Sequence, residues 1–159
     1  MRLRTMEEDD AAYLLEIFSD PAAMKYYPST KDRHDTLEWI KWTQDNYRKF
    51  GMGMWVAEMK ETGQFAGQCG LVPQKIADSV ELELGYLFAR KHWGKGLATE
   101  AALACKNYGF QQLGLERIIS LIDPENLSSV KVAERAGLSF EKEIVKWGKL
   151  LCLYSVHHT

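Results

Sequence analysis

The stretch RKHWGKGLATEA, residues 90–101, carries more information about the fold than any other part of this 159-residue sequence. It follows a strand-like run at residues 80–88 and leads into apolar residues at helical spacing over residues 97–108. Its two glycines permit backbone conformations closed to other residues and a close approach to a ligand. The amides after them lie at a helix N-terminus, which favours an anion, and Lys91 and Lys95 add positive charge. The loop is therefore predicted to seat a diphosphate.

Upstream of this loop the sequence predicts a short strand, two helices and an antiparallel meander. Thr5 and Glu8 have capping-box spacing before a helix that ends at Asp20-Pro21. Asp35 and Glu38 indicate the start of a second helix, which Gly51 ends. The expected strands, separated by turn residues, are 3–5, 54–59, 65–72 and 80–88.

Downstream of the loop the pattern predicts a strand, a helix and a hairpin. The expected elements are a strand at 117–122, a helix at 129–136, and hairpin strands at 138–146 and 149–156 around Trp147-Gly148. The strand–helix–strand unit across residues 80–122 favours a parallel strand pair, so the sheet should be mixed. We expect an α/β fold (an α+β mixed sheet) with about four helices in one domain, residues 1–159.

Composition excludes several classes of protein. Apolar residues make up 46% of the chain, which is enough for a core, and the formal net charge of -2 comes with no long basic run. We therefore expect no nucleic-acid partner. No apolar stretch approaches the roughly 20 residues of a membrane span, and no secretory signal follows Met1, so a cytoplasmic protein with no membrane partner is expected. The four histidines have no metal-ligand spacing, so no metal is expected.

Other glycine motifs fit the loop less well. The spacing of a P-loop is absent, and Thr99 stands where a dinucleotide fingerprint needs a third glycine or alanine. A nucleotide-binding oxidoreductase is therefore a weaker alternative. A plain turn whose glycines only serve helix entry is a further alternative.

A second motif, DPENLSSVKVAERAGL at residues 123–138, follows a strand and opens a helix. Alone it reads as helix capping. Together, the two motifs resemble those of the GNAT superfamily of acetyltransferases. Residues 91–96 match its Gln/Arg-x-x-Gly-x-Gly/Ala loop, with Lys91 as a departure, and residues 126–129 match its Asn-x-x-Ser helix entry. The phrase ELGY at residues 83–86 resembles the branch of ribosomal-protein N-terminal (alanine/serine) acetyltransferases.

The resemblance implies a three-layer, GNAT-like fold in which strands 80–88 and 117–122 splay apart around the pantetheine arm of acetyl-CoA, the co-substrate. Backbone groups of three strand residues would bond this arm: Leu87, Phe88 and Ala89. Loop amides would hold the diphosphate, and they belong to Trp93, Gly94, Lys95, Gly96, Leu97 and Ala98. The Asn126 side chain would face the arm near its thiol.

The resemblance also implies direct attack of a primary amine on the thioester. Glu83 is the expected general base, acting through a water, with Glu81 on the same strand face as the alternative. Ser129 is the expected partner of the departing sulfur, because Ala133 stands where many members of the family have a tyrosine. Three tyrosines are further candidates for the partner of the sulfur: Tyr86, Tyr108 and Tyr154. Solvated strand carboxylates and a Ser129 that bonds only its own helix are the structural alternatives.

The resembling branch implies that the acceptor is a protein N-terminus, such as that of a ribosomal protein. A polyamine, an aminoglycoside and an amino acid stay open, as do a homodimer and a non-catalytic acyl-CoA-binding module. Aromatic residues are candidates for the acceptor walls, with ordinary packing as the alternative. They are Tyr26, Tyr27, Trp39, Trp42 and Trp147.

Overall fold

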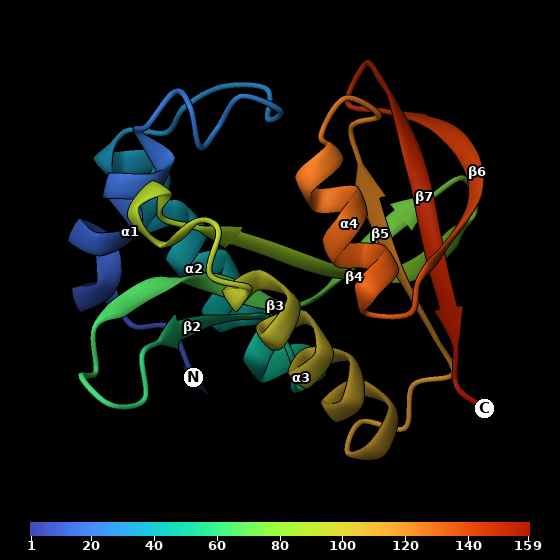
Figure 1. Ribbon diagram of the computed structural model, residues 1–159, viewed down its shortest axis with the longest axis horizontal. Helices are drawn as coiled ribbons and strands as arrows, with labels where there is room; N and C mark the ends of the chain where they lie inside the picture. Colours follow the sequence, from blue (N-terminus) through green and yellow to red (C-terminus); the bar gives the residue numbers. More distant parts are fainter.

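A computed structural model describes all residues, 1–159, as one seven-stranded mixed sheet with helices on both faces (Figure 1). The strands are β1 (Arg2–Arg4), β2 (Met54–Glu58), β3 (Phe65–Ile76), β4 (Ser79–Phe88), β5 (Arg117–Ile122), β6 (Ser139–Lys146) and β7 (Lys149–His157). The helices are α1 (Ala11–Phe18), α2 (Arg33–Phe50), α3 (Leu97–Gln111) and α4 (Leu127–Arg135), with 3-10 turns at Glu8–Asp10 and Arg90–His92.

Two apolar clusters hold the helices to the sheet, one on each face. Leu14 of α1 and Ile40 of α2 belong to the cluster that includes Val56 of β2. Ala101 of α3 and Ala133 of α4 belong to the other cluster. Since successive strand residues point to opposite faces, the nearly continuous burial along β2 and β3 follows from this double cover. The three-layer arrangement expected from the sequence is confirmed.

The sheet splits between β4 and β5. The strand order is β1-β2-β3-β4-β5-β7-β6, and β4–β5 is the only parallel neighbour pair. These two strands pair at a single position, Glu83 with Ile119, whereas β3 follows β4 over its whole length to Gly67–Phe88. Beyond Glu83, one edge of β4 therefore has no strand partner. The predicted mixed sheet with a splayed parallel pair is confirmed.

Two helices begin earlier than the sequence pattern predicts. Helix α2 starts at Arg33, because the Asp32 side chain accepts the Asp35 N–H at 2.8 Å as an N-cap. Helix α4 starts at Leu127, because Asn126 caps it. The first turns of the two helices, Arg33–Asp35 and Leu127–Ser129, are wholly or mostly polar, so the apolar periodicity marks both helix starts too late.

The other boundaries show smaller differences. The capping box near the N-terminus lies at Glu7 and Asp10, so its predicted position at Thr5 and Glu8 is wrong. Strand β3 continues to Ile76, beyond the predicted end at residue 72, because its pairing with β4 extends past the apolar residues. The hairpin turn is confirmed, with φ of 55° at Trp147 and 69° at Gly148. None of the helices has the length and apolar character that crossing a membrane requires.

Candidate active site

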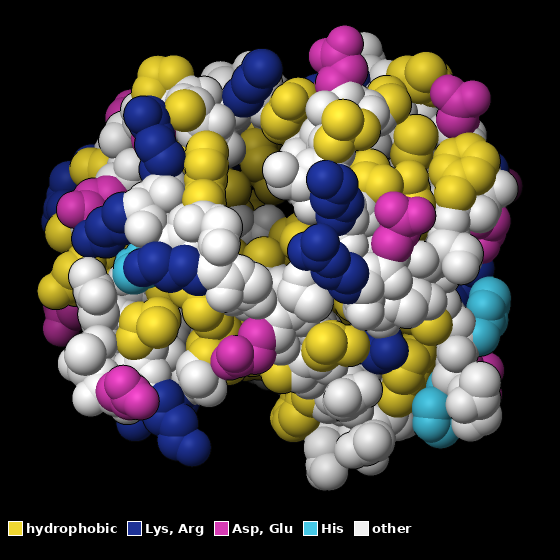
Figure 2. Space-filling model, viewed as in Figure 1, with side chains coloured by type: hydrophobic (Ala, Val, Ile, Leu, Met, Phe, Trp, Pro, Cys, Tyr) yellow, Lys and Arg dark blue, Asp and Glu magenta, His cyan; other side chains and the backbone are white.

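The splayed strands open a cleft of about 470 Å³. Its walls come from the α1–α2 loop, α2, β3, β4, β5, the start of α4 and the β6–β7 hairpin. Figure 2 shows the molecule hollowed at its centre, with apolar side chains deep inside and Lys or Arg side chains around the mouth. Residues far apart in the sequence therefore meet in one partly enclosed space.

Glu83 lies where β4 and β5 separate, and its side chain lines the cleft. Burial raises the pKa of its carboxyl group to about 7, against smaller lowering effects from Gln74, the Leu121 N–H and Lys146. Gln74 Nε2 donates to the carboxylate at 2.9 Å. A carboxylate with this pKa exchanges protons near neutral pH, which suits a general base.

This pKa has a consequence for stability that can be measured. The pKa of Glu83 in the folded protein lies above the ordinary glutamate value of 4.5, so the folded protein holds an extra proton between about pH 4.5 and 7. It therefore loses stability as the pH rises through that window. Glutamine cannot ionise. We expect the unfolding free energy of Glu83→Gln, relative to that of wild type, to rise by about 1–2 kcal/mol when the pH is raised from 4.5 to 8. This range allows for the partial exposure of the carboxylate. Urea unfolding of both proteins at pH 4.5 and at pH 8 measures this change. The same free-energy difference between variant and wild type at the two pH values would contradict it.

Glu81 has different surroundings, although it lies on the same strand. Its carboxylate accepts two bonds from Arg117 Nε at 3.1 Å and one from Nη2 at 2.8 Å. Arg117 also binds Glu141 across to β6. Glu81 does not line the cleft. The structure thus separates the two carboxylates that the sequence left as alternatives.

Helix α4 is tied to β4 across the cleft. The Tyr86 hydroxyl donates to the Ser129 carbonyl oxygen at 2.6 Å, and the Ser129 N–H donates to Asn126 Oδ1 at 3.3 Å. Tyr86, Asn126 and Ser129 all line the cleft. Burial raises the pKa of Tyr86 well above its ordinary range, so its hydroxyl stays protonated. Ala133 is fully buried against the sheet and does not reach this space.

The three candidate tyrosines, Tyr86, Tyr108 and Tyr154, do not all line the cleft. Of the three, only Tyr86 lies in the cleft. Tyr108 packs edge-on against Trp55, and Tyr154 packs against Phe140. Sequence reasoning missed Tyr27 as a titratable group of the cleft; burial and the charge of Glu83 raise its pKa to about 12.

The glycine loop exposes a run of unbonded amides. The Trp93 N–H donates to the Arg90 carbonyl at 3.1 Å, and the Glu100 N–H donates to the Gly96 carbonyl at 3.1 Å. Between them, the amides of residues 94–99 have no backbone acceptor outside the helix ladder, and α3 only begins at Leu97. Such amides at a helix N-terminus are an anion seat. The predicted run is thus present from Gly94 onward, while the Trp93 N–H is already engaged.

Backbone conformation explains the two glycines of this loop. Gly94 has a φ of 78°, and Gly96, which caps α3, has a φ of 75°. A Cβ atom built on either residue would meet nothing within 4 Å. Packing therefore does not require glycine here, whereas the left-handed conformation does.

The free edge of β4 presents alternate backbone groups to the cleft. The Ala89 N–H donates to Ala66 on β3 at 2.9 Å, and alternation in an antiparallel ladder turns Leu87 toward β3 as well. Tyr86 and Phe88 therefore face the side where β5 has departed. The Phe88 carbonyl accepts the Trp93 indole N–H at 2.9 Å. Of the three residues predicted to bond the arm through their backbone, Phe88 faces the free edge, whereas the N–H groups of Leu87 and Ala89 face β3.

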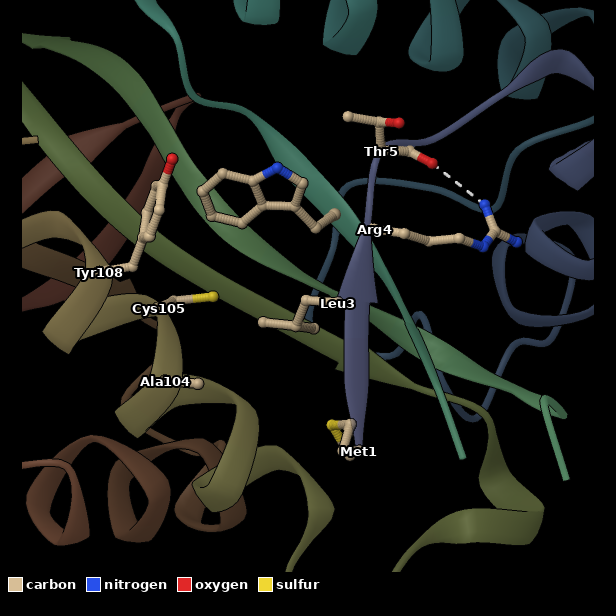
Figure 3. A pocket seen from close by; sticks show the side chains of 8 residues that line it. Met1, Leu3, Arg4, Thr5, Ala104, Cys105 and Tyr108 are labelled. Atoms are coloured by element: carbon tan, nitrogen blue, oxygen red, sulfur yellow. Dashed lines mark hydrogen bonds between the residues drawn. The ribbon is translucent and has the colours of Figure 1, made fainter. Parts of the chain in front are cut away.

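A second cavity, of about 460 Å³, lies between β1 and α3 (Figure 3). It is mostly apolar and holds no carboxylate or histidine. Its lining residues are Met1, Leu3, Arg4, Thr5, Trp55, Ala104, Cys105 and Tyr108. Figure 3 shows the Arg4 guanidinium turned away to the Thr5 carbonyl, at 3.0 Å. No group of three or more metal-ligating side chains occurs in the protein. The cleft at Glu83 is therefore the site with acid–base chemistry.

Comparison with known proteins identifies the family of the chain. The profile of the Acetyltransferase (GNAT) domain family matches residues 1–139. The YkkB protein of Bacillus subtilis (strain 168) is 47% identical, covering 97% of this chain and 90% of its own. The N-acetyltransferase p20 of Bacillus licheniformis is 35% identical, with 90% and 80% covered. Spermidine N(1)-acetyltransferase of Escherichia coli (strain K12) is 24% identical, with 91% and 76% covered.

Solved structures share the fold. An acetyltransferase from Agrobacterium tumefaciens has a TM-score of 0.86 at 28% identity, covering 98% of this chain and 90% of its own. Ribosomal-protein-S5-alanine acetyltransferase from Vibrio fischeri has a TM-score of 0.80 at 17% identity, with 98% and 91% covered. The Salmonella typhimurium acetyltransferase yncA, solved with acetyl-CoA, has a TM-score of 0.75 at 19% identity, with 98% and 92% covered. With a family profile across most of its length and this site, the chain belongs to the GNAT family and is an acetyl-CoA-dependent N-acetyltransferase.

Proposed function

We propose that residues 1–159 form one N-acetyltransferase domain in which Glu83 deprotonates the acceptor amine, through a water, for attack on the acetyl thioester. The observation that carries the proposal is a cleft carboxylate with a pKa of about 7 at the point where the two strands separate. Acetyl-CoA supplies the activated acetyl group. Glu83 supplies proton removal, without which an ammonium group cannot attack.

The residues of the cleft and its rim fit the coenzyme. The amides from Gly94 to Ala98 would hold the diphosphate, with Lys91 and Lys95 adding positive charge. Phe88 would bond the pantetheine arm along the free edge of β4, with Leu87 and Ala89 beside it, in the manner of an added strand. The Asn126 side-chain oxygen is engaged by Ser129, which leaves its NH₂ group to face the arm.

Negative charge develops on the carbonyl oxygen of the thioester during attack and needs hydrogen-bond donors. The departing thiolate of coenzyme A needs a proton. The N–H groups on the free edge of β4 would stabilise the negative charge that develops on this carbonyl oxygen. The Ser129 hydroxyl is the proposed donor to sulfur, because the single proton of the Tyr86 hydroxyl is already given to the Ser129 carbonyl.

A pair of single substitutions separates Ser129 from Tyr86. We expect Ser129→Ala to lower kcat about tenfold, which is less than the usual 10²–10⁴-fold for a lost proton donor because a thiolate is a good leaving group. The acetyl-CoA affinity should stay within about twofold. We expect Tyr86→Phe to cost about 1 kcal/mol of stability through the lost bond to α4. Steady-state kinetics and urea unfolding measure the two effects. A larger kcat loss in Tyr86→Phe than in Ser129→Ala would reassign the donor to Tyr86.

The proposed acceptor is an α-amine, such as a protein N-terminus. Moving a proton from an α-amine, with a pKa of about 8, to a base near 7 costs about 1.4 kcal/mol. The same transfer from a lysine-like amine at about 10.4 costs about 4.6 kcal/mol. Glu83 is thus matched to α-amines. The Vibrio fischeri neighbour is named for an alanine of a ribosomal protein. The Escherichia coli relative is named for spermidine, a polyamine, which is the alternative acceptor class.

An acceptor screen tests this function. Purified protein is mixed with acetyl-CoA and either N-terminal peptides, amino acids, spermidine or an aminoglycoside, and thiol release is followed with acetylated products identified by mass. The proposal expects the highest kcat/KM among α-amines. Spermidine or an aminoglycoside as the best acceptor would contradict the α-amine assignment. Coenzyme binding with no thiol release for any amine would instead support a non-catalytic module.

A further inference from the structure

The cleft holds one cation that no carboxylate of the chain neutralises. The charged side chains that line it are Lys31, Glu83, Asp123 and Lys149. Lys149 forms an ion pair with Asp123, and its Nζ also donates to the Tyr26 carbonyl at 3.0 Å. Glu83 is bonded by Gln74. No ion pair includes Lys31.

Lys31 is nevertheless held in place. Its backbone N–H donates to the Phe18 carbonyl at 2.8 Å. Its Nζ lies 5.6 Å from the centre of the Trp39 ring and 6.0 Å from that of Phe18, which is cation–π geometry. Trp39 is itself fixed, because its Nε1 donates to Gln68 Oε1 at 2.9 Å. The ammonium group is therefore positioned on an aromatic wall, with hydrogen-bond donors to spare.

The surroundings of Lys31 favour one kind of acceptor. A polycation would place its remaining charges beside Lys31 in a cleft whose only other carboxylate, Asp123, is already paired. A carboxylate near the reacting amine would instead meet an ammonium group with no partner, partly shielded from water. The apolar body of such an acceptor would pack against the neighbouring Trp39 and Trp42 rings, whose centres are 5.1 Å apart.

We propose that Lys31 is a specificity-determining residue that binds a carboxylate carried by the acceptor close to its reacting α-amine. The proposal rests on the proposed function and narrows its acceptor class. Two sources share this chemistry. One is an acidic side chain just after the N-terminus of a peptide, and the other is the α-carboxylate of a free amino acid.

The test compares acceptors that differ only in that carboxylate. The peptide pair is Ala-Glu-Ala-amide and Ala-Gln-Ala-amide, and the small pair is alanine and alaninamide, with spermidine as the polycation. The quantity measured is the ratio of kcat/KM within each pair for wild type, Lys31→Met, Lys31→Arg and Lys25→Met. Comparing each ratio between proteins cancels differences in amine basicity. Lys25, in the same loop but outside the cleft, gives the matched control.

We expect Lys31→Met to lower the ratio at least fivefold in one of the two pairs, which identifies the source of the carboxylate. Lys31→Arg should keep most of the wild-type ratio, and Lys25→Met should keep all of it. Ratios that are the same in Lys31→Met and wild type, or spermidine as the best wild-type acceptor, would overturn the assignment of Lys31. Failure to acetylate any amine would overturn the proposed function as well.

Discussion

Glu83→Gln should lower kcat for amine acetylation by about 10²–10³-fold, within the usual range for a lost general base. Glutamine keeps the size of the side chain and its bond with Gln74, but it cannot accept the proton of the amine. The coenzyme amides lie on a separate loop, so acetyl-CoA affinity should stay within about twofold. Steady-state rates and calorimetric titration of the coenzyme measure the two quantities.

The pH dependence of kcat carries a second signature of the same residue. Glu83 acts when deprotonated, so the wild-type kcat should rise through about pH 7 and then level off. Glu83→Gln should lack that rise. Glu81→Gln is the matched control, because Glu81 lies two residues earlier on β4 but is tied to Arg117 outside the cleft. A rise that is lost in Glu81→Gln and kept in Glu83→Gln would exchange the roles of the two carboxylates.

Gly96→Val should weaken acetyl-CoA binding by at least tenfold. A left-handed backbone costs an L-residue about 1–2 kcal/mol, and more when the side chain is β-branched. The loop can relieve this strain by turning, which misaligns the amides that follow Gly96. Each charge-assisted hydrogen bond lost is worth about 1.5–3 kcal/mol. Calorimetric titration with coenzyme A measures the change in affinity.

Gly63→Val is the control for backbone strain alone. Gly63 has a φ of 71°, close to the 75° of Gly96, and a Cβ atom on it also meets nothing within 4 Å. It lies in the turn between β2 and β3, away from the cleft. Both variants should lose similar stability, but only Gly96→Val should lose coenzyme affinity. Equal loss of affinity in the two would mean that strain alone, rather than the position of the amides, explains the effect.

The glycine loop could be predicted from the sequence because its chemistry is local. The positive φ of Gly94 and Gly96, the helix start at Leu97 and the unbonded amides between them all depend on about ten consecutive residues. The parallel pairing of β4 and β5 could be predicted for a related reason, since a helix between two strand-like runs favours a parallel pair. Their splaying, in contrast, is implied only by the resemblance to the GNAT superfamily. Local patterns of this kind determine most of the fold.

The roles of single side chains in the cleft depend on contacts that local patterns do not contain. Glu81 and Glu83 share a strand face, and contacts with other strands distinguish them: Arg117 of β5 binds Glu81, whereas Gln74 of β3 binds Glu83. Lys31 lies in a polar loop, and nothing nearby in the sequence shows that its ammonium group packs on Trp39. Which backbone groups of β4 stay free follows from its register with β3, which the sequence does not show.

The central claim is that the amides of residues 94–98 bind the diphosphate of the coenzyme beside the cleft of Glu83. Titration of ¹⁵N-labelled protein with coenzyme A, followed residue by residue through the amide signals, tests it most directly. We expect large, saturable shifts at Gly94, Lys95, Gly96, Leu97 and Ala98, because these N–H groups gain an anionic acceptor. Saturable binding that leaves these five signals in place, with shifts instead around the cavity of Trp55 and Tyr108, would contradict the account.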